Sequence, residues 1–296
     1  MKSISALRQQ NGVVLVFVLW VVVLLSAIAG NFIVKSDVET KITSNAVDRL
    51  KVYALAEKGV FAAVLKLVEI SSNNHIKYSV EKEFIKSDGD SYSYSISYES
   101  GKIDINYAGR ALIKEMFVQQ DLGEKDIELI VDSILDWRDP DKLRRLNGAE
   151  DLDYKSAGYN YQSKDQHFDT IEELKLLMGM NNDIYSSIES LITVDGYSAR
   201  INPVYASEKV LRVIPNLSND EFVSFVSLRD SNIIQAKKIL VYSPSANFFT
   251  YESNNIFRIK SQGKIKSGAK SCIDAVVLLS KKTNRPFEFL KWRNGC

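Results

Sequence analysis

The sequence predicts an α+β fold, in which a long N-terminal helix packs on an antiparallel sheet and a large helical segment interrupts that sheet. Three observations lead to this prediction. An uncharged run near the N-terminus passes without a break into an amphipathic helical pattern. Strand-like alternation follows it and returns near the C-terminus. Between these two stretches, the apolar residues recur at helical spacing.

The overall composition fits one large domain or two modest ones, with 296 residues, 45% of them hydrophobic. Because 38 basic residues nearly balance 37 acidic ones, no overall field draws the chain toward nucleic acid or anionic lipid. Cys272 and Cys296 lack a CxxC neighbour, so a structural zinc site is not expected. His75 and His167 lie far apart in polar surroundings, and no role is assigned to either.

The N-terminal segment predicts a membrane anchor. Residues 13–34 contain no charged side chain and are mostly apolar, and about 20 such residues in a helix cross a hydrocarbon core of roughly 30 Å. Lys2 and Arg8 precede the span, and Asp37 and Glu39 follow it. This asymmetry places the N-terminus in the cytoplasm and the bulk of the chain outside it.

A cleaved signal peptide ending near Gly30 is the alternative interpretation of this segment. The uncharged run is long for a signal peptide, and no proline interrupts residues 13–70. A single helix over 13–70 is therefore predicted, with its second half packing one face on the soluble part of the protein. The apolar residues that define that face are Val38, Ile42, Ala46, Leu50, Ala54, Phe61, Leu65 and Val68.

Two stretches, 71–106 and 241–296, are predicted to supply the strands of one sheet. Tyr92, Tyr94, Ile96 and Tyr98 alternate with serines, a pattern typical of a half-buried strand. The other predicted strands are 77–85, 102–105, 255–259, 272–279 and 287–292. Within this sheet domain, Cys272 and Cys296 could form a disulfide, which an exported compartment permits and which would contribute ~3 kcal/mol; two unpaired thiols are the alternative.

Residues 107–240 are predicted to form an inserted, all-helical domain. Thr170 and Glu173 make a capping box, which favours a helix start there. The predicted helices are 109–119, 124–136, 170–178, 183–191, 205–214, 219–227 and 233–240.

The densest group of chemically active side chains lies in residues 133–154. Six carboxylates occur there, and they are Asp136, Asp139, Asp141, Glu150, Asp151 and Asp153. Pro140 stops any helix, so the carboxylates lie at a helix end and in a loop. They would repel one another unless solvated, paired with nearby arginines, or bridged by a hard cation such as calcium. Their spacing is not that of an EF-hand, and it leaves a solvated acidic loop and a calcium site both open.

An acid–base enzyme is a third interpretation of these carboxylates, because paired carboxylates hydrolyse glycosides. No aromatic-rich sugar platform and no histidine neighbours them in the sequence. Walker, GxSxG, HExxH and dinucleotide-binding motifs are also missing from the sequence. The sequence therefore predicts a protein that is not an enzyme.

Three segments, 105–112, 168–180 and 201–211, resemble helix-hairpin-helix and SAM-like modules. Such hairpins often grip DNA phosphates, which suggests an alternative function as a membrane-anchored DNA-uptake or type IV pilus component. Phosphate binding requires a local excess of lysine and arginine. Residues 120–190 are rich in acids instead, so no nucleic-acid partner is expected.

The short basic leader that ends in Gly12 before a continuous helix resembles the start of type IV pilins and pseudopilins. In that family a prepilin peptidase cleaves after the glycine, here between Gly12 and Val13, and methylates the new N-terminus. Family members usually carry glutamate at the fifth mature position. In this chain that position is Phe17.

Segments along almost the whole chain together resemble the general secretion pathway protein K family, the minor pseudopilins K of type II secretion systems. They are DWRDPDKLRRLNGAEDLDY, IEELKLLMGM, LITVDGYSARINPVYASEKVLRVIP and PFEFLKWR. This family typically lacks the fifth-position glutamate. The resemblance implies a pilin-like fold and calcium in the insert, held by some of the six carboxylates.

The same resemblance implies the location, the partners and the function. The location would be the inner membrane, with a single pass and the bulk of the chain in the periplasm. The partners would be pseudopilins I, J and H, the major pseudopilin and the inner-membrane assembly platform. The function would be to nucleate and cap, at its tip, the fibre that drives folded proteins across the outer membrane. Because an unpaired charge in a low-dielectric helix bundle costs several kcal/mol, a subunit with phenylalanine in place of glutamate can be the first one.

Overall fold

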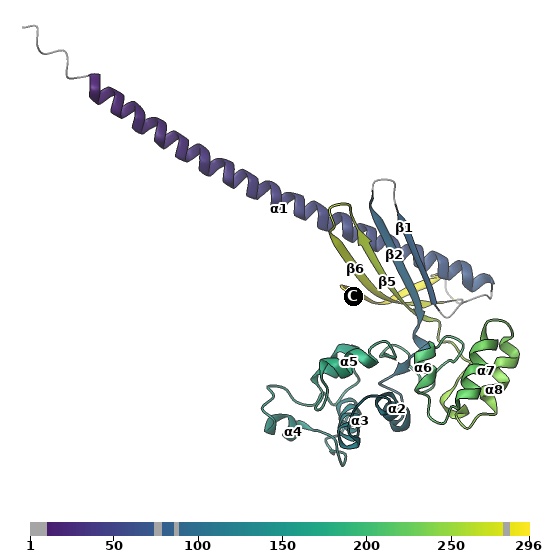
Figure 1. Ribbon diagram of the computed structural model, residues 1–296. Coiled ribbons are helices and arrows are strands. Elements are labelled where there is room, and N and C mark those ends of the chain that lie inside the picture. The colour runs from purple at the N-terminus through teal and green to yellow at the C-terminus, as the bar shows by residue number, and fades with distance from the viewer. Residues whose placement is uncertain (1–10, 74–78, 86–88, 281–284) are drawn as a thin grey trace, which may run out of the picture.

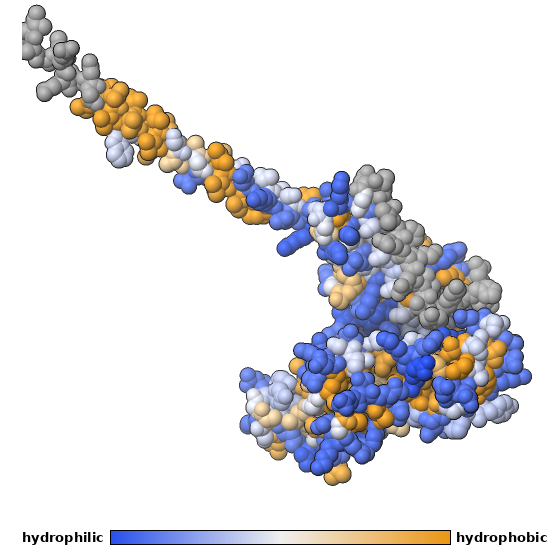
Figure 2. Space-filling model, viewed as in Figure 1, coloured by the Kyte–Doolittle hydropathy of each residue, from blue (hydrophilic) through white to orange (hydrophobic). Residues whose placement is uncertain are grey.

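The long N-terminal helix dominates the shape of the protein (Figure 1). The computed structural model describes residues 11–73, 79–85, 89–280 and 285–296. Helix α1 runs unbroken over Asn11–Asn73, and its 63 residues span about 95 Å. Every large apolar side chain from Val13 to Val34 is exposed, and the helix is long and apolar enough to cross a membrane (Figure 2). The predicted N-terminal apolar helix is confirmed.

A five-stranded antiparallel sheet lies against the second half of α1. Its strands are β1 (Ser79–Ile85), β2 (Ser91–Tyr98), β5 (Ile256–Lys264), β6 (Lys270–Leu279) and β7 (Phe287–Asn294), in the order β1-β2-β5-β6-β7. Positions 77 and 78 of the first predicted strand lie outside the described residues. Strands β2 and β5 are neighbours in space although more than 150 residues separate them, so the helical segment is inserted between them.

The helix and the sheet approach each other at backbone distance. A Cβ atom on Gly263 of β5 would overlap the carbonyl oxygen of Val52 in α1, and one on Gly59 would overlap the side chain of Ser261. The buried residues that α1 presents to the sheet include Ala56, Val60, Ala63, Val64 and Leu67. They meet one face of the sheet, formed by residues that include Ile96, Phe257, Ile259, Ile273, Ala275 and Val277.

The apolar stripe predicted to pack α1 on the soluble part was the wrong one except at Phe61, whose ring meets Phe289 and Trp292 of β7 at 5.9 and 6.4 Å between centroids. Of the predicted residues, Leu50 is 71% exposed, Leu65 71% and Phe61 43%, and Val38, Ile42, Ala46, Ala54 and Val68 are exposed as well. The helix carries two apolar stripes with the same three- and four-residue steps, and the one that starts at Val52 faces the sheet. Periodicity alone does not tell which of two such stripes meets a partner.

The segment between β2 and β5 is mostly helical, but strand β4, which lies inside the insert predicted over 107–240, corrects the all-helical prediction. Its elements are η1 (Glu99–Gly101), β3 (Ile103–Asp104), α2 (Arg110–Val118), α3 (Glu124–Arg138), α4 (Asp151–Ser156), η2 (Ile171–Leu176), α5 (Asn182–Ile188), β4 (Ile192–Thr193), α6 (Glu208–Arg212), α7 (Asn219–Arg229), α8 (Ile233–Val241) and η3 (Ala246–Phe248). Strand β3 pairs in parallel with β4, so the segment predicted as a third strand of the main sheet leaves that sheet. The capped start at Thr170 opens a 3₁₀ helix, and the helix predicted over 205–214 shrinks to α6.

The two parts of the protein have separate apolar cores. One core lies wholly in the insert and includes Leu112, Ile134 and Phe225, and the other lies between α1 and the sheet. Tyr205 of the insert joins them by stacking on Tyr98 of β2, with ring centroids 3.7 Å apart. In Figure 1 the insert lies below the sheet, whereas α1 runs diagonally across the strands.

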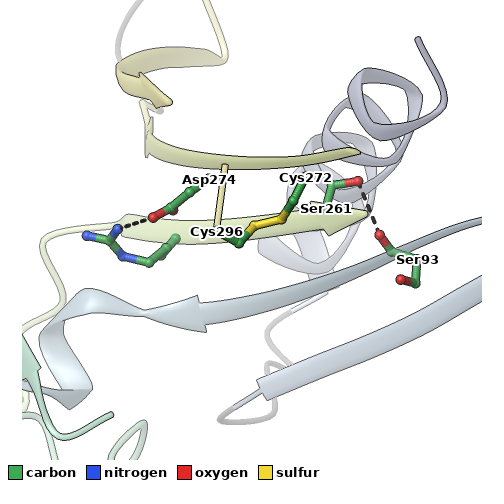
Figure 3. Close-up of a disulfide and its surroundings, with 6 residues drawn as sticks. Ser93, Ser261, Cys272, Asp274 and Cys296 are labelled. Atoms are coloured by element: carbon green, nitrogen blue, oxygen red, sulfur yellow. Dashed lines mark hydrogen bonds and ion pairs between the residues drawn. A yellow bond between two sulfur atoms is a disulfide. The ribbon is translucent and has the colours of Figure 1, made fainter. Parts of the chain in front are cut away.

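A disulfide closes the C-terminal end of the sheet (Figure 3). It joins Cys272 in β6 to Cys296, with 5.6 Å between the two Cα atoms. The N–H of Gly295 donates to the carbonyl oxygen of Cys272 at 2.8 Å, which continues the ladder beyond β7. The bond thus ties the last residue to the central part of the sheet.

Candidate metal centre

The acidic segment turns back on itself between α3 and α4. Helix α3 extends two residues beyond its predicted end and stops at Arg138, just before Pro140. Asp136 lies in the last turn of α3 and is fully buried. Residues 139–150 then return as a loop, and Glu150 stands at the N-cap of α4. The chain thereby brings the two ends of the acidic segment together.

Three carboxylates in this region have the spacing of a cation site. Oxygen atoms of Glu150, Asp151 and Asp165 all lie within 4.8 Å of one another. Calcium binds oxygens at about 2.3–2.6 Å, so two ligands of one ion lie up to about 5 Å apart. Asp165 holds a left-handed backbone conformation, with φ of 52°, which asparagine and aspartate adopt more readily than most residues. The chain bends at this residue, which brings its carboxylate to the cluster.

The carboxylate of Glu150 is both buried and unsatisfied. Glu150 is 5% exposed and stands in a capping box, in which its side chain faces the N–H of Asp153, but neither of its carboxylate oxygens makes a hydrogen bond of normal geometry to a described residue. One buried oxygen each of Asp139, Asp151 and Asp165 is unsatisfied in the same sense. Buried polar atoms almost always have partners. Four acidic residues with such atoms in one place fit a bound cation.

The charge balance of the cluster points the same way. Burial raises the pKa of Glu150 to about 7, and the neighbouring charges of Asp165, Asp136 and Asp139 add to this effect. Holding Glu150 ionised therefore costs free energy in the metal-free chain. A divalent cation at the same place would remove that cost.

Two basic side chains offset part of this charge. Arg145 pairs with Asp136 at 2.6 Å and also with Asp139, so these carboxylates are partly compensated. Burial raises the pKa of Asp136, and the hydrogen bonds and charge of Arg145 oppose that rise. Lys142 lies 2.8 Å from Asp151 and 3.8 Å from Asp165, but its side chain is 69% exposed. Lys142 can therefore swing into solvent when a cation takes its place.

Two of the six predicted carboxylates point away from the cluster. Asp141 is exposed and accepts a hydrogen bond from the N–H of Leu143 at 2.8 Å. Asp153 accepts from the N–H of Glu150 at 3.0 Å and pairs with Arg144 at 3.0 Å. The structure thus gathers Asp136, Asp139, Glu150 and Asp151, adds Asp165, and leaves Asp141 and Asp153 in local roles.

Aromatic side chains lie beside the cluster, contrary to what the sequence suggested. Trp137 and Tyr154 are buried and meet edge to face, with ring centroids 5.8 Å apart. Tyr161 lies 5.7 Å from Tyr154, and Phe168 stacks 6.2 Å from Trp137. Since Trp137 and Tyr154 are buried, these two rings offer no open face on which a sugar could stack.

Comparison with known proteins identifies the segment that holds the cluster. Residues 95–195 match the family described as "Type II secretion system (T2SS), protein K". This stretch is similar to a protein K domain. The resemblance that the sequence suggested is confirmed, and all the gathered carboxylates lie inside the matched range.

Relatives with this description are about a quarter identical to this chain over the residues that match. Type II secretion system protein K of Klebsiella pneumoniae is 25% identical over 200 residues, which cover 61% of this chain and 61% of the relative. The protein of the same description from Pseudomonas aeruginosa is 23% identical over 256 residues, which cover 78% of this chain and 75% of the relative. The match thus covers somewhat less than two thirds of the Klebsiella protein.

A solved structure shares the fold around the protein K domain. It is a chain of the GspK-GspI-GspJ complex from the type 2 secretion system of enterotoxigenic Escherichia coli. The TM-score is 0.60 at 13% sequence identity, and the match covers 82% of this chain and 96% of the other. At this identity, the match establishes a common fold.

Proposed function

We propose that this chain is a minor pseudopilin of a type II secretion system. It would sit at the tip of the pseudopilus, where it nucleates and caps the fibre that drives folded proteins across the outer membrane. The family match and the shared fold support this proposal. The observation that carries it is the series of exposed apolar side chains on α1, which is continuous from Val13 to Val34 and recurs at intervals as far as Val68.

The uncovered face of α1 fits another helix. Val47, Leu50, Ala54 and Leu65 are exposed on α1, at the spacing of a coiled-coil seam. Toward the N-terminus the same helix continues into the exposed apolar span. The occupants would be the N-terminal helices of pseudopilins I and J, with H and the major pseudopilin below them. The solved structure with a similar fold is a complex of GspK, GspI and GspJ, which supports that choice.

The residue at the fifth mature position supports a place at the tip. Phe17 is 68% exposed on α1 and brings no charge into the helix bundle. A glutamate there would need the N-terminal amine of a subunit already in place, because an unpaired charge in a low-dielectric bundle costs several kcal/mol. The insert, with its helix-hairpin-helix and SAM-like segments, lies on the far side of a pilin-like sheet. Its bulk would obstruct a further subunit above.

The location follows from the same proposal. The chain would cross the inner membrane once at residues 13–34, with its N-terminus in the cytoplasm and the bulk in the periplasm. Prepilin peptidase would cleave between Gly12 and Val13, and methylate Val13. The assembly platform in the inner membrane would then build the subunit into the fibre.

Capture of partner pseudopilins tests the helix face directly. The full chain is co-expressed with pseudopilins I and J of the same system and purified through a tag on this chain. The double substitution Leu50→Gln and Leu65→Gln should reduce the amount of captured partner at least tenfold, because it puts polar groups into the proposed helix interface. Both side chains are exposed and lie outside the core between α1 and the sheet, so the variant should still fold. The control is Lys51→Gln, a change at an exposed position beside the stripe. Unchanged capture by the double variant would refute the proposed helix interface.

We propose, further, that the acidic cluster binds a structural calcium ion. Glu150, Asp151 and Asp165 would be ligands, with Asp136 and Asp139 close by. The orphaned oxygens of Glu150 support this proposal. The ion would hold the loop between α3 and α4 in place, and no catalytic role is assigned to it.

Terbium, a calcium substitute, provides the test because Trp137 and Tyr154 lie close enough to sensitise its luminescence. Titrating the full chain with terbium should give a saturable signal that calcium displaces. Glu150→Gln should abolish this signal, whereas Asp141→Asn should leave it unchanged, because Asp141 caps its own loop. A signal that survives Glu150→Gln would rule out this site.

A further inference from the structure

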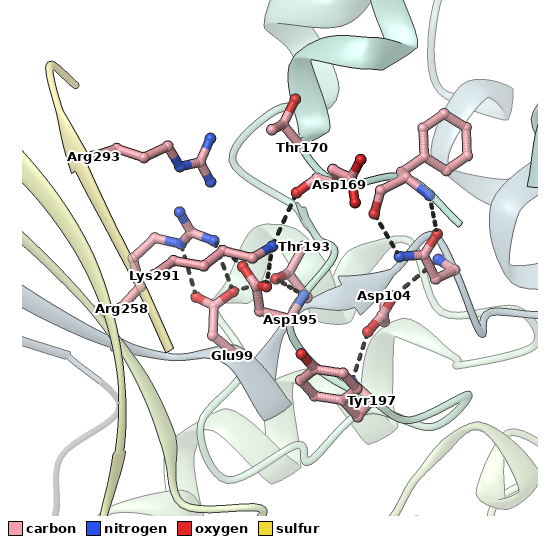
Figure 4. A network of polar contacts seen from close by, with 12 residues as sticks. Glu99, Asp104, Asp169, Thr170, Thr193, Asp195, Tyr197, Arg258, Lys291 and Arg293 are labelled. Carbon is pink, nitrogen blue, oxygen red and sulfur yellow. Dashed lines mark hydrogen bonds and ion pairs between the residues drawn. The ribbon is translucent and has the colours of Figure 1, made fainter. Parts of the chain in front are cut away.

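A buried cluster of charges lies where the sheet meets the insert (Figure 4). Its centre is Arg258 of β5, which is 8% exposed. The Nε of Arg258 lies 3.2 Å from Glu99, one terminal nitrogen lies 2.8 Å from Asp274, and the other lies 2.7 Å from Asp195. The three carboxylates come from the turn after β2, from β6 and from the insert. One guanidinium group therefore joins three parts of the chain.

The face of the sheet turned toward the insert is basic. Arg258 and Lys291 stand in one row across β5, β6 and β7, since each pairs with Val276. Lys291 lies 2.6 Å from Asp195 and donates to the carbonyl oxygen of Asp169 at 2.9 Å. The insert thus presents carboxylate and carbonyl oxygens to a row of sheet cations.

The remaining charges of the cluster are balanced inside the junction. Glu99 is fully buried, and Lys102 lies 2.8 Å from it. Burial alone would raise the pKa of Glu99, but the charges of Lys102 and Arg258 lower it to about 2. Thr193 of β4 donates to the same carboxylate. Glu99 is therefore ionised at any physiological pH, so the cluster is a permanent set of ion pairs.

Apolar packing contributes little to this junction. The two apolar cores share no residue among those described, and the stacked pair of Tyr98 and Tyr205 bridges them. The backbone contributes a hydrogen bond from Asn202 to Ser100 at 2.7 Å, and the Asn254 side chain donates to the carbonyl oxygen of Gly196 at 2.6 Å. Directional polar contacts, more than area, therefore set how the insert sits on the sheet.

We propose that Arg258 is the positioning residue that fixes the insert on the sheet, through a fork that reaches three carboxylates at once. A guanidinium has donors in a rigid plane, whereas a lysine ammonium is a single point of charge. Lysine at this position would keep the charge but lose at least one of the three contacts. The proposal concerns how one chain holds its two parts, so it does not depend on the function proposed above.

The test measures the distance between the two parts in the full chain, held in lipid nanodiscs. Spin labels are attached at Lys264→Cys in the sheet and Ser186→Cys in α5, two exposed positions, with the native disulfide intact. Pulsed electron–electron resonance should give one narrow distance distribution for the otherwise unchanged chain. Arg258→Met should at least double the width of this distance distribution, and Arg258→Lys should widen it nearly as much.

A matched control lies two residues away on the same strand face. Lys260 is exposed and takes part in none of the ion pairs found among the described residues, so Lys260→Met should leave the distribution narrow. A second variant, Asp195→Asn, removes a contact from the insert side while Arg258 keeps Glu99 and Asp274. It should also broaden the distribution.

Hydrogen exchange separates repositioning from unfolding. Amides in the core of α3 and of β6 should keep their protection in Arg258→Met, whereas the amide of Asn202 at the junction should exchange about tenfold faster. A narrow distribution in Arg258→Met would overturn the proposal, and so would full recovery in Arg258→Lys. Loss of protection throughout α3 or β6 would show that Arg258 is needed for the folding of a core. That result would also overturn the proposal.

Discussion

Replacing Glu150 with glutamine should have opposite effects on stability without and with calcium. Without calcium, Glu150 is a buried carboxylate beside other carboxylates, so the neutral and nearly isosteric glutamine should stabilise the region. With calcium, the same carboxylate becomes a ligand, so the variant should miss the stabilisation that the ion gives. A residue that only fills space would show the same effect under both conditions.

The magnitude follows from the raised pKa. The pKa of Glu150 rises from 4.5 to about 7, and at 1.36 kcal/mol per pKa unit this corresponds to at most roughly 3 kcal/mol. The side chains of Asp151 and Asp165 are 23% and 20% exposed, so solvent screens part of the repulsion. About 2 kcal/mol is a reasonable expectation. The unfolded chain loses its proton near pH 4.5 and the folded chain near pH 7, so the metal-free protein loses stability as pH rises across this window.

Hydrogen exchange in the full chain measures this effect locally. The amides of Asp153 and Tyr154 bond to the carbonyl oxygen of Glu150 at 2.8 and 3.1 Å, so they report opening of the start of α4. In a chelator at pH 8, exchange at these amides in Glu150→Gln should be roughly 30-fold slower than in the unchanged chain, the equivalent of about 2 kcal/mol. At pH 4 the two proteins should exchange alike. In excess calcium at pH 8 the order should reverse.

Two results would refute this reasoning. If Glu150→Gln exchanged faster than the unchanged chain in chelator at pH 8, the carboxylate would have a favourable partner of its own. If calcium slowed exchange equally in both proteins, the ion would bind elsewhere. Asp141→Asn serves as the control and should behave like the unchanged chain under every condition, because its carboxylate bonds within its own loop.

Three further predictions concern the rest of the chain. Replacing Cys272 and Cys296 by serine should lower the stability of the sheet by about 3 kcal/mol, measured by denaturant unfolding of the sheet, because the disulfide closes a loop of 24 residues; an unchanged midpoint would contradict this. Gly263→Ala should destabilise the packing of α1 on β5 by about 1–3 kcal/mol, since the new methyl group meets a backbone carbonyl, whereas Gly268→Ala, in a turn with open space, tests only the strain of a positive φ. The full chain should not shift duplex DNA in a gel at low salt, and a shift that added salt abolishes would favour the DNA-uptake alternative.

The sequence predicted the elements of the sheet well because their patterns are local. The alternation at Tyr92–Tyr98 became β2, and the apolar run at 272–279 became β6. The segment at 102–105 has the same local character, yet Ile103 and Asp104 pair with Ile192 and Thr193. No local pattern near 102–105 indicates a pairing partner some 90 residues away. The prediction that this segment belongs to the main sheet was therefore wrong.

The sequence predicted the segment that holds the candidate metal centre, but it did not predict which carboxylates gather there. Acidic density pointed to the right segment, but it could not separate ligands from capping residues. Asp153 was drawn into the start of α4, and Asp141 into a turn, because short carboxylates readily bond to nearby backbone N–H groups. Asp165 stands outside the dense segment, and its one local signal is a residue type that tolerates the left-handed conformation.

The junction around Arg258 could not be predicted from the sequence. An arginine that alternates with apolar residues on a strand is normally a solvent-facing residue. Its partners Glu99 and Asp195 lie 159 and 63 residues away, and neither sits in a motif. Such a network becomes visible only when the insert has been placed on the sheet.

The identity of the first residue of the mature protein tests the central claim most directly. The protein is isolated from membranes of a host that contains prepilin peptidase, and its intact mass and N-terminal peptide are measured. A pseudopilin should begin at N-methylated Val13 and keep the whole apolar half of α1. A mature chain that begins at Gly30 would lack the membrane span and the helix face on which assembly depends, and would contradict the account.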